Sequence, residues 1–279
     1  MDSAEAVHLR TWRAELELGF ERRSERTVLA TRRHDGPLAV QKPLYPEGGD
    51  VCHAIVLHPP GGIAGGDELE ITVRAADRSH ALLTTPGATK WYRTAGPWAS
   101  QSLTIEVADG ACVEWLPQET ILFDGALAAT RTELRLSGSA RYIGWEVLCL
   151  GRGGSGERFA RGACRLETAL RRDGRLLRFE RGTIEGGGTL LDSPAGLAGD
   201  PVCGTLLASA EGLEALLAPC RDLQPESGAG AVTLLPGVLV ARYLGGSSES
   251  AKGYFSRLWA VLRPAVAGRE AVEPRIWST

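Results

Sequence analysis

The amino-acid sequence predicts one mainly β domain over residues 1–279, built from many short strands and ending in a helical segment. Three observations favour this fold class. Several segments alternate apolar and polar residues, which is the spacing of a half-buried strand. The chain contains 35 glycines, a density that is typical of many turns between short strands. Apolar residues at helical spacing form a clear stripe only near the C-terminus.

The first predicted strand lies in the segment TWRAELELGF, where Ala14, Leu16, Leu18 and Phe20 share one face with Trp12. A strand places every second side chain on the same face, so this spacing predicts a buried apolar face. Further runs with the same alternation follow in chain order: DELEITVRA, SLTIEVADGACVEWL, ATRTELRL and RYIGWEVLCL.

Asp-Gly pairs separate several of these runs, at Asp35–Gly36, Asp109–Gly110 and Asp173–Gly174. Two-residue hairpin turns need positive φ angles, which Asp-Gly adopts at low cost. An Asp-Gly pair between alternating runs is therefore a strong signal for a β-hairpin. We expect a hairpin at each of these positions.

The clearest helix lies in GSSESAKGYFSRLWAVLRP, where apolar residues recur at helical spacing between Ala251 and Leu262. Ser247 or Ser248 can cap its first turn, and Pro264 is expected to stop it. The segment EGLEALLAP, near residues 211–219, predicts a second and shorter helix.

Composition limits the classes of partner and the compartment. The net charge is −3 and the charges are interspersed, so we expect no nucleic-acid partner. The N-terminus has no apolar segment of a secretory signal, and no apolar run is long enough to span a bilayer. The six cysteines are scattered without a CxxC pair, which favours reduced thiols over a structural zinc site. We expect a cytoplasmic protein without membrane contact.

Familiar catalytic motifs are absent from the sequence or lack their context. GRGGSG, at residues 151–156, matches the GxGxxG pattern. A dinucleotide loop needs a helix directly after it, whereas Gly162 interrupts the segment that follows here. We interpret these residues as an exposed loop. The sequence has no P-loop, no HExxH and no GxSxG, so we expect neither nucleotide hydrolysis nor a hydrolytic triad.

Acidic residues within apolar segments are the most informative candidates for a site. Glu146 and Glu180 lie within such segments, and Glu119 and Asp124 flank the segment TILF. A buried carboxylate is costly unless it is paired or bound to a metal. One reading is a salt bridge to one of the arginines. The other is a transient ligand for a divalent metal such as nickel. Gly144 shares a strand face with Glu146, and this glycine would leave room for water or a metal.

The segment HPPGGIAGGD, from His58 to Asp67, combines stiff prolines with permissive glycines. It lacks the helix N-terminus and the lysine that a phosphate cradle needs. We interpret it as a rigid turn that places Asp67 at the start of the next strand. Its glycines allow a neighbouring backbone or a partner to approach closely.

Many long motifs together resemble one family, the urease accessory protein UreD, which is called UreH in some systems. The resemblance runs from about Leu38 to Thr279, with the motifs in the same order. The motifs are VQKPLYPEG, CHAIVLHPPGGIAGGD, LLTTPGATKWYR, EWLPQETILF, GWEVLCLGR, LLPGVLVARYLG, LWAVLRP and PRIWST.

This resemblance implies a mainly β fold whose short strands stack as in a β-helix or a β-sandwich. It implies a non-catalytic scaffold that acts with UreF and the GTPase UreG to deliver nickel into apo-urease. No tightly bound cofactor is implied, only transient nickel(II). The nickel path in this family is thought to be lined partly by acidic residues. The positions that map onto it are Asp67, Glu146 and Glu180, with His58 and Glu119 as additions.

Two other classes of function remain open from the residues alone. A metal-dependent hydrolase is suggested by the His, Asp and Glu residues, and it needs a stable metal with an open coordination position. A β-rich ligand-binding module is suggested by the seven tryptophans. Metal retention after dialysis distinguishes the hydrolase from the scaffold, and co-purification with UreF and UreG distinguishes the scaffold from both.

Overall fold

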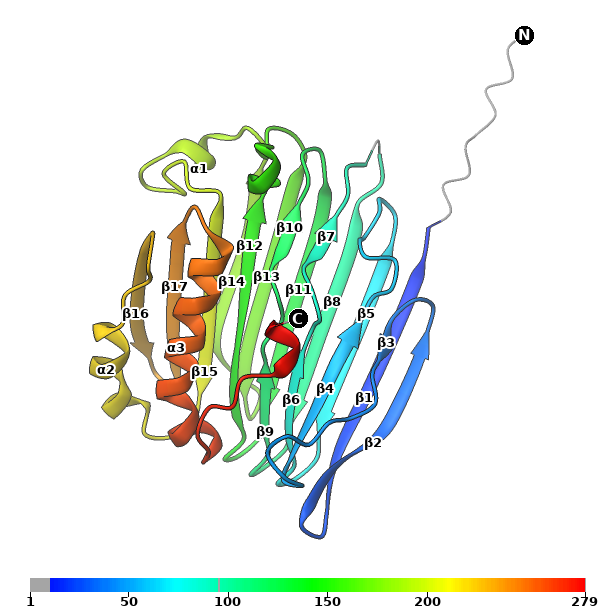
Figure 1. The fold of residues 1–279 in the computed structure, drawn as a ribbon, viewed down its shortest axis with the longest axis vertical. Helices are drawn as coiled ribbons and strands as arrows, with labels where there is room; N and C mark the ends of the chain where they lie inside the picture. The colour runs from blue at the N-terminus through cyan, green and yellow to red at the C-terminus, as the bar shows by residue number, and fades with distance from the viewer. Residues whose placement is uncertain (1–10, 95, 279) are drawn as a thin grey trace.

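Two stacked β-sheets and a long C-terminal helix form the structure, which is a computed structural model that describes residues 11–94 and 96–278 (Figure 1). Helix α3 lies across the outer face of one sheet. The predicted mainly β class, with stacked strands and a C-terminal helix, is confirmed.

The seven-stranded sheet has the order β14-β13-β11-β8-β5-β1-β2. Its five inner strands run parallel, and the strand at each edge is antiparallel to its neighbour. Its strands are β1 (Arg13–Arg23), β2 (Arg26–Asp35), β5 (Glu68–Ala75), β8 (Ala99–Val107), β11 (Leu127–Leu136), β13 (Ala163–Arg172) and β14 (Arg175–Glu185).

The ten-stranded sheet has the order β16-β17-β15-β12-β9-β6-β4-β3, with β10 and β7 attached beside β12. Strands β4, β6, β9 and β12 run parallel. Its strands are β3 (Ala39–Val40), β4 (Val51–Leu57), β6 (His80–Thr84), β7 (Thr89–Trp91), β9 (Cys112–Trp115), β10 (Thr120–Leu122), β12 (Arg141–Leu150), β15 (Val202–Ser209), β16 (Ala229–Leu235) and β17 (Val238–Gly245).

From β4 to β13 the chain crosses repeatedly from one sheet to the other, with one or two strands in the ten-stranded sheet before each return, and these crossings produce the parallel order in both. Two of the predicted hairpins are therefore wrong. Asp35–Gly36 joins β2 to β3, and Asp109–Gly110 joins β8 to β9, so each pair turns the chain from one sheet into the other. Both glycines have positive φ, as a tight turn requires. Asp173–Gly174 does join an antiparallel hairpin, β13–β14.

Strand alternation places the core where the sequence predicts it. Ala14, Leu16, Leu18 and Phe20 of β1 are buried between the sheets. Burial of each large apolar side chain stabilises the fold by about 1.5–3 kcal/mol. In β12 the two faces have different partners, because Tyr142 and Leu148 face the other sheet whereas the alternate residues pack beneath α3.

Helix α3 (Ser248–Ala267) is the longest helix among the described residues. Ser247 is its N-cap and accepts a hydrogen bond from the Ser250 amide at 3.1 Å, as predicted. The expected stop at Pro264 is wrong, because the helix continues to Ala267 and ends at Gly268 in the left-handed conformation. The Gly268 amide donates to the Pro264 carbonyl and closes the last turn.

The shorter helix predicted near residues 211–219 begins later and less regularly than expected. A 3-10 turn, η2 (Leu213–Leu216), leads into α2 (Leu217–Asp222). The other short elements are α1 (Thr189–Asp192), η1 (Gly153–Ser155) and η3 (Arg275–Ser278). Residues 151–156 contain only the short turn η1, and no α-helix follows them directly. All six cysteines are free, as predicted.

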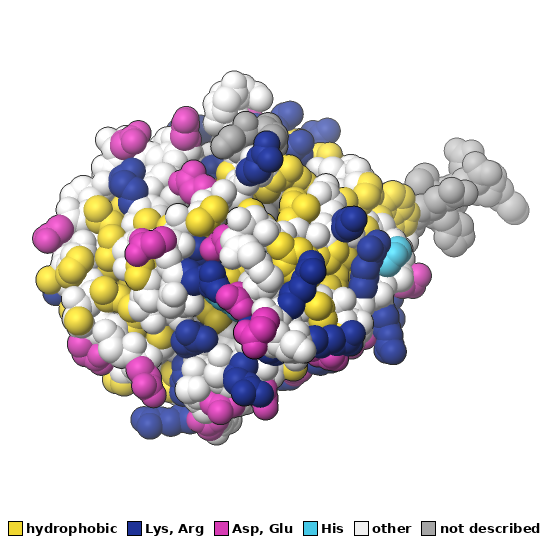
Figure 2. All heavy atoms as spheres, turned by 60° about the horizontal axis from the view of Figure 1, so that its bottom comes forward, with side chains coloured by type: hydrophobic (Ala, Val, Ile, Leu, Met, Phe, Trp, Pro, Cys, Tyr) yellow, Lys and Arg dark blue, Asp and Glu magenta, His cyan; other side chains and the backbone are white. Residues whose placement is uncertain are grey.

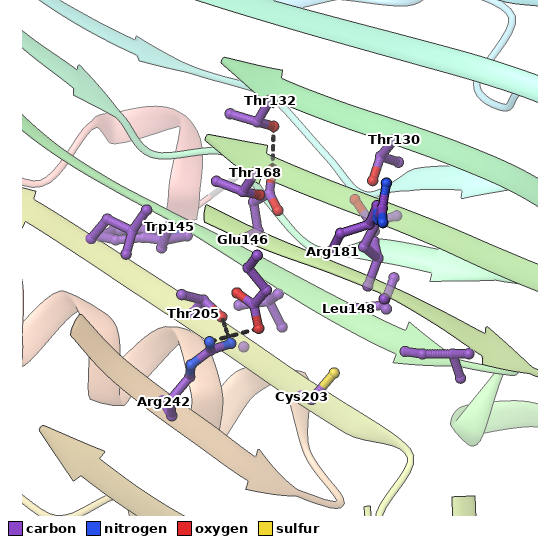
Figure 3. Close-up of a pocket in the computed structure, with 18 of the residues that line it drawn as sticks. Thr130, Thr132, Trp145, Glu146, Leu148, Thr168, Arg181, Cys203, Thr205 and Arg242 are labelled. Atoms are coloured by element: carbon purple, nitrogen blue, oxygen red, sulfur yellow. Dashed lines mark hydrogen bonds and ion pairs between the residues drawn. The ribbon is translucent and has the colours of Figure 1, made fainter. Parts of the chain in front are cut away.

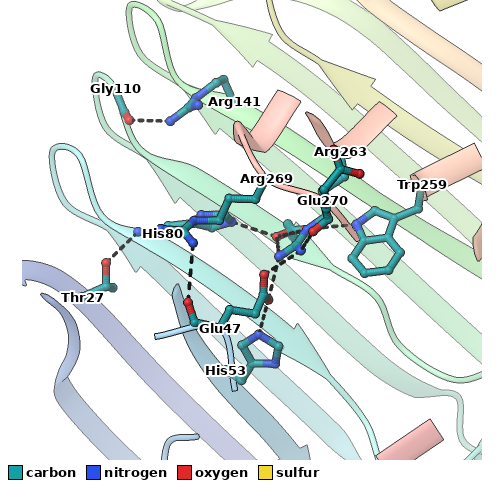
Figure 4. Close-up of polar contacts among 11 residues, drawn as sticks. Thr27, Glu47, His53, His80, Gly110, Arg141, Trp259, Arg263, Arg269 and Glu270 are labelled. Atoms are coloured by element: carbon teal, nitrogen blue, oxygen red, sulfur yellow. Dashed lines mark hydrogen bonds and ion pairs between the residues drawn. The ribbon is translucent and has the colours of Figure 1, made fainter. Parts of the chain in front are cut away.

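A buried charged network holds α3 on the ten-stranded sheet (Figure 4). The Arg263 guanidinium is fully buried and donates to Glu114 at 3.0 Å and to Glu47 at 2.7 Å. Glu114 also accepts hydrogen bonds from Trp259 at 2.6 Å and from His80 at 2.8 Å. Buried charges are stable only with such partners, so the network fixes the position of the helix.

The same network shifts the pKa values of its members. Burial would raise the pKa of Glu47, but hydrogen bonds from His53 and Arg263 lower it to about 2. Burial would lower the pKa of His80, but its interactions with Cys112 and Glu114 raise it to about 10. His80 is therefore charged at neutral pH and offsets the charge of Glu114.

The surface carries both signs of charge. On the face in Figure 2, lysine and arginine side chains are interspersed with aspartate and glutamate, and no large area of one sign forms there. On the seven-stranded sheet, Arg135 pairs with Glu106 at 2.8 Å and with Glu133 at 3.0 Å. Exposed pairs of this kind contribute little stability each.

We expect Arg263→Ala to lower the free energy of unfolding by about 3–5 kcal/mol, because two buried carboxylates lose their shared partner. Urea denaturation followed by circular dichroism measures this change. Arg257→Ala is the matched control, since Arg257 lies on the same helix and makes only exposed contacts, an ion pair with Glu226 at 3.9 Å and a hydrogen bond to the Gln224 carbonyl at 2.7 Å. The control should change stability by less than about 0.5 kcal/mol; equal losses in both variants would contradict the role of Arg263.

The stability of the wild-type protein should fall at alkaline pH. The folded-state pKa of His80 is raised, so its contribution is complete below its ordinary value of 6.5 and is lost as pH rises towards about 10. His80→Gln keeps a hydrogen-bond donor but no titrating charge, so it should be less stable at neutral pH and flatten this slope. Urea midpoints measured from about pH 6 to about pH 10 test this; identical slopes for both proteins would refute it.

Candidate functional site

Two cavities lie between the sheets. The larger cavity has a volume of about 640 Å³ and is lined by strands from both sheets. The smaller has a volume of about 270 Å³ and lies towards the turn after β4. Both are lined by Gln101, Trp115, Thr120 and Glu146, so Glu146 lies at the boundary of the two cavities.

A layer of polar side chains from both sheets lines the larger cavity (Figure 3). On the ten-stranded sheet, the in-register residues of β12, β15 and β17 are Glu146, Thr205 and Arg242. On the facing sheet, the in-register residues of β11, β13 and β14 are Thr132, Thr168 and Glu180. Strand register aligns the three side chains within each sheet, and the Thr132–Glu146 and Arg242–Glu180 hydrogen bonds join the two sets.

Glu146 spans the space between the sheets. Thr132 donates a hydrogen bond to its Oε1 at 3.0 Å. Its side chain keeps exposed surface, yet desolvation by the surrounding protein, together with Glu180, raises its pKa. These two facts agree because the exposed surface faces the cavities rather than bulk water. Glu146 is therefore available to a ligand that enters them.

Glu180 also lines the larger cavity, but two arginines hold it. Its Oε1 accepts a hydrogen bond from Arg242 at 2.7 Å, and its Oε2 pairs with Arg178. Burial would raise the pKa of Glu180, but these two guanidinium groups lower it. The carboxylate therefore serves first as the shared partner of two cations.

The space beside Gly144 is occupied by protein. A Cβ added at Gly144 would overlap the Tyr142 hydroxyl and the Trp115 carbonyl. The glycine is needed for this close packing, rather than to leave the vacant position that the sequence suggests. Burial and the neighbouring Glu146 raise the pKa of Tyr142, so its phenol stays protonated beside the carboxylate.

His58 lies at the smaller cavity, which it shares with Glu146. Its Nε2 is buried and has no hydrogen-bond partner within the described residues. Burial lowers its pKa, with Asp67 acting weakly in the opposite direction. A neutral imidazole with a free ring nitrogen is the form that binds transition metals.

Asp67 has a structural position, and it lines neither of these cavities. Its carboxylate accepts hydrogen bonds from the amides of Trp12 at 2.9 Å and Ala64 at 2.8 Å. It lies directly before β5, at the end of the predicted rigid turn. Gly65 is packed against Thr94, so the turn does allow the close approach that its glycines predict.

Glu119 faces α3 rather than the space between the sheets. Its Oε2 lies 2.8 Å from the Lys252 Nζ, and Glu119 lines neither cavity. The structure thus brings Glu146 together with Glu180 at one cavity and with His58 at the other, whereas Asp67 and Glu119 line neither cavity. Within residues 11–94 and 96–278, no group of three or more His, Cys, Asp or Glu side chains has the arrangement of a metal site.

The sequence patterns did not identify the two cations of the site, Arg178 and Arg242. Arg242 interrupts the apolar run GVLVARYLG in the same way that Glu146 interrupts its own strand, and this signal could have identified it. Arg178 lies in a more polar strand and gives no such signal. Arg178 and Glu180 lie two residues apart on β14, so strand spacing could have paired them. Arg242 reaches Glu180 from the other sheet, a contact that spacing along the chain does not report.

Comparison with known proteins gives consistent results along the chain. A family model described as UreD urease accessory protein matches residues 13–278. A protein named urease accessory protein UreD from Azoarcus sp. (strain BH72) is 58% identical over 269 residues, covering 96% of this chain and 94% of its own. A protein of the same name from Dechloromonas aromatica is 55% identical, and the match covers 98% of this chain and 96% of that protein. Another from Pseudomonas aeruginosa is 54% identical, and the match covers 96% of this chain and 95% of that protein.

The part of the chain that the structure describes contains no helix both long and apolar enough to cross a membrane.

We expect Asp67→Ala to lower the free energy of unfolding by about 1–3 kcal/mol, because two amide groups lose their acceptor. Asp67→Asn should cost less, since it keeps one side-chain oxygen. Asp77→Ala is the control, because Asp77 is an exposed carboxylate in the turn after β5. Thermal unfolding of the variants measures the difference; an unchanged melting temperature for Asp67→Ala would contradict the structural role.

Proposed function

The chain belongs to the UreD family of urease accessory proteins, and on this premise we propose that it is a non-catalytic scaffold that delivers nickel into apo-urease. In this proposal it acts in the cytoplasm with UreF and the GTPase UreG. The family match across residues 13–278 is the observation that carries the proposal. Nickel is the cargo of the scaffold and not a resident cofactor.

The geometry of the two cavities supports a path for the ion. A divalent cation that enters a protein must replace part of its hydration shell with protein ligands. Glu146 offers oxygen to both cavities, and His58 offers a free ring nitrogen to the smaller one. A position that offers the ion only a few protein ligands binds it weakly enough to release it to the next position. Glu146 is therefore the central residue of the proposed path.

The remaining candidate residues have different parts in this proposal. Glu180 offsets one of the two positive charges of Arg178 and Arg242, and so it limits the positive charge that the ion meets in the larger cavity. Asp67 shapes the turn that ends β4, and Glu119 pairs with the helix α3. Both act by keeping the cavity walls in place.

Reconstitution tests the proposal directly. Apo-urease, nickel, bicarbonate, GTP, UreF and UreG are combined with and without the purified chain, and urease nickel and activity are measured. We expect activation to depend on the chain, and the chain alone to hydrolyse neither GTP nor urea. Full activation in its absence would refute the proposal. Metal that stays bound to the chain through dialysis, with catalytic turnover, would instead support the metal-dependent hydrolase.

We expect Glu146→Gln and His58→Gln to lower the nickel content of urease several-fold when combined, while the complex with UreF and UreG still assembles. The reason is that both substitutions remove metal ligands without changing side-chain size greatly. Glu133→Gln is the control, because Glu133 follows Thr132 on β11 and points to the outer face, where it pairs with Arg135. Nickel analysis of urease, with melting temperatures of each variant, measures the effect.

Nickel loss that only follows loss of folded protein would show that Glu146 and His58 act structurally. Full nickel loading with the double variant would exclude these two side chains from the path.

A further inference from the structure

We propose that the larger cavity binds a small oxoanion, such as bicarbonate or phosphate, between Arg178 and Arg242. This proposal goes beyond nickel delivery and does not depend on it. It rests on the donors that face the cavity, on their charge, and on the lack of acceptors for them.

Arg178 supplies a buried donor with no acceptor. It lies on the inner face of β14, lines the larger cavity, and is only 8% exposed. One terminal nitrogen, Nη2, pairs with Glu180, whereas the other, Nη1, has no hydrogen-bond partner within the described residues. Leaving a buried donor of a charged group without an acceptor costs free energy. A ligand that supplies an acceptor there removes this cost when it binds.

Arg242 approaches the same cavity from the opposite sheet (Figure 3). It donates to the Thr205 hydroxyl at 2.6 Å and to Glu180 at 2.7 Å. A guanidinium has more N–H donors than these two contacts use. Its side chain is 46% exposed, so an entering ligand reaches it without opening the core.

Hydroxyl groups add neutral donors to the cavity wall. Thr130 and Thr168 line the cavity from β11 and β13. Their hydroxyls make no side-chain hydrogen bond to another described residue. Arginine and threonine donors around one space are the groups that hold oxoanions in proteins, and the planar guanidinium matches a pair of anion oxygens.

The charge balance favours an anion over a cation beside the arginines. Glu180 is the only carboxylate that contacts Arg178 and Arg242 within the described residues, so these three side chains together carry a net positive charge. Glu146 lies at the same level on β12, two strands away from Arg242, and is hydrogen-bonded to Thr132. Unbalanced charge in a partly desolvated space attracts a counter-ion strongly.

Isothermal titration of the purified chain tests the proposal. Sodium phosphate and sodium bicarbonate are titrated separately near neutral pH, with sodium chloride of matched ionic strength as the reference. We expect saturable binding of at least one oxoanion, and none of chloride. The anion that binds identifies the preferred geometry, tetrahedral for phosphate and planar for bicarbonate. No saturable binding of either one to the folded wild-type chain would overturn the proposal.

Variants locate the site. Arg242→Met should weaken binding by at least about 10-fold, because one charged contact is lost. Arg175→Met is the matched control, since Arg175 lies on β14 but outside the cavity lining. Arg242 is half-exposed, so its variant is informative even where Arg178→Met does not fold. Wild-type affinity in Arg242→Met would overturn the proposal.

Glu180→Gln makes a second and opposite test. Removal of the competing carboxylate frees both guanidinium groups, so we expect this variant to bind the oxoanion several-fold more tightly than the wild type. A merely structural cluster predicts no gain of affinity. Weaker binding in a variant with an unchanged melting temperature would contradict the proposed contacts.

Discussion

Arg263 lies fully buried between Glu114 and Glu47, and the position of the C-terminal helix depends on this contact. A single buried ion pair gains little over an apolar contact, because desolvation offsets the attraction. Here the carboxylate of Glu114 is shared with Trp259 and His80 as well. The groups satisfy one another only in one placement of α3, so the network selects that placement more than it adds stability.

The position of α3 in turn fixes β12, the strand on which the two halves of the molecule meet. Ile143, Trp145 and Val147 pack beneath the helix. The strand pleat then directs Glu146 into the space between the sheets. Trp277 packs against Trp145 and Trp259 near the C-terminus, and so covers the same strand from outside. The outer face of β12 is thus structural, and its inner face is open to ligands.

The space between the sheets has two chemically different ends. Near His58 and Glu146 it offers a free ring nitrogen and a carboxylate oxygen, which suit a transition metal. Near Arg178 and Arg242 it offers guanidinium groups, which suit an anion. Glu180 separates the two by neutralising part of the positive charge. A scaffold for nickel delivery that also holds an oxoanion would keep the cation and the anion apart along one passage.

The sequence by itself determined the mainly β class, the buried face of the alternating strands, the C-terminal helix and the isolation of the cysteines. These follow from spacing within single segments, as in β1, where alternation alone identifies Leu16 and Leu18 as core. It also identified Glu146 as an acid on an otherwise apolar strand. It did not determine that Asp109–Gly110 leads into another sheet, that Pro264 lies within α3, or that Arg242 pairs with Glu180. Those features depend on strand pairing and helix packing between distant segments, and only the tertiary structure decides which distant segments meet.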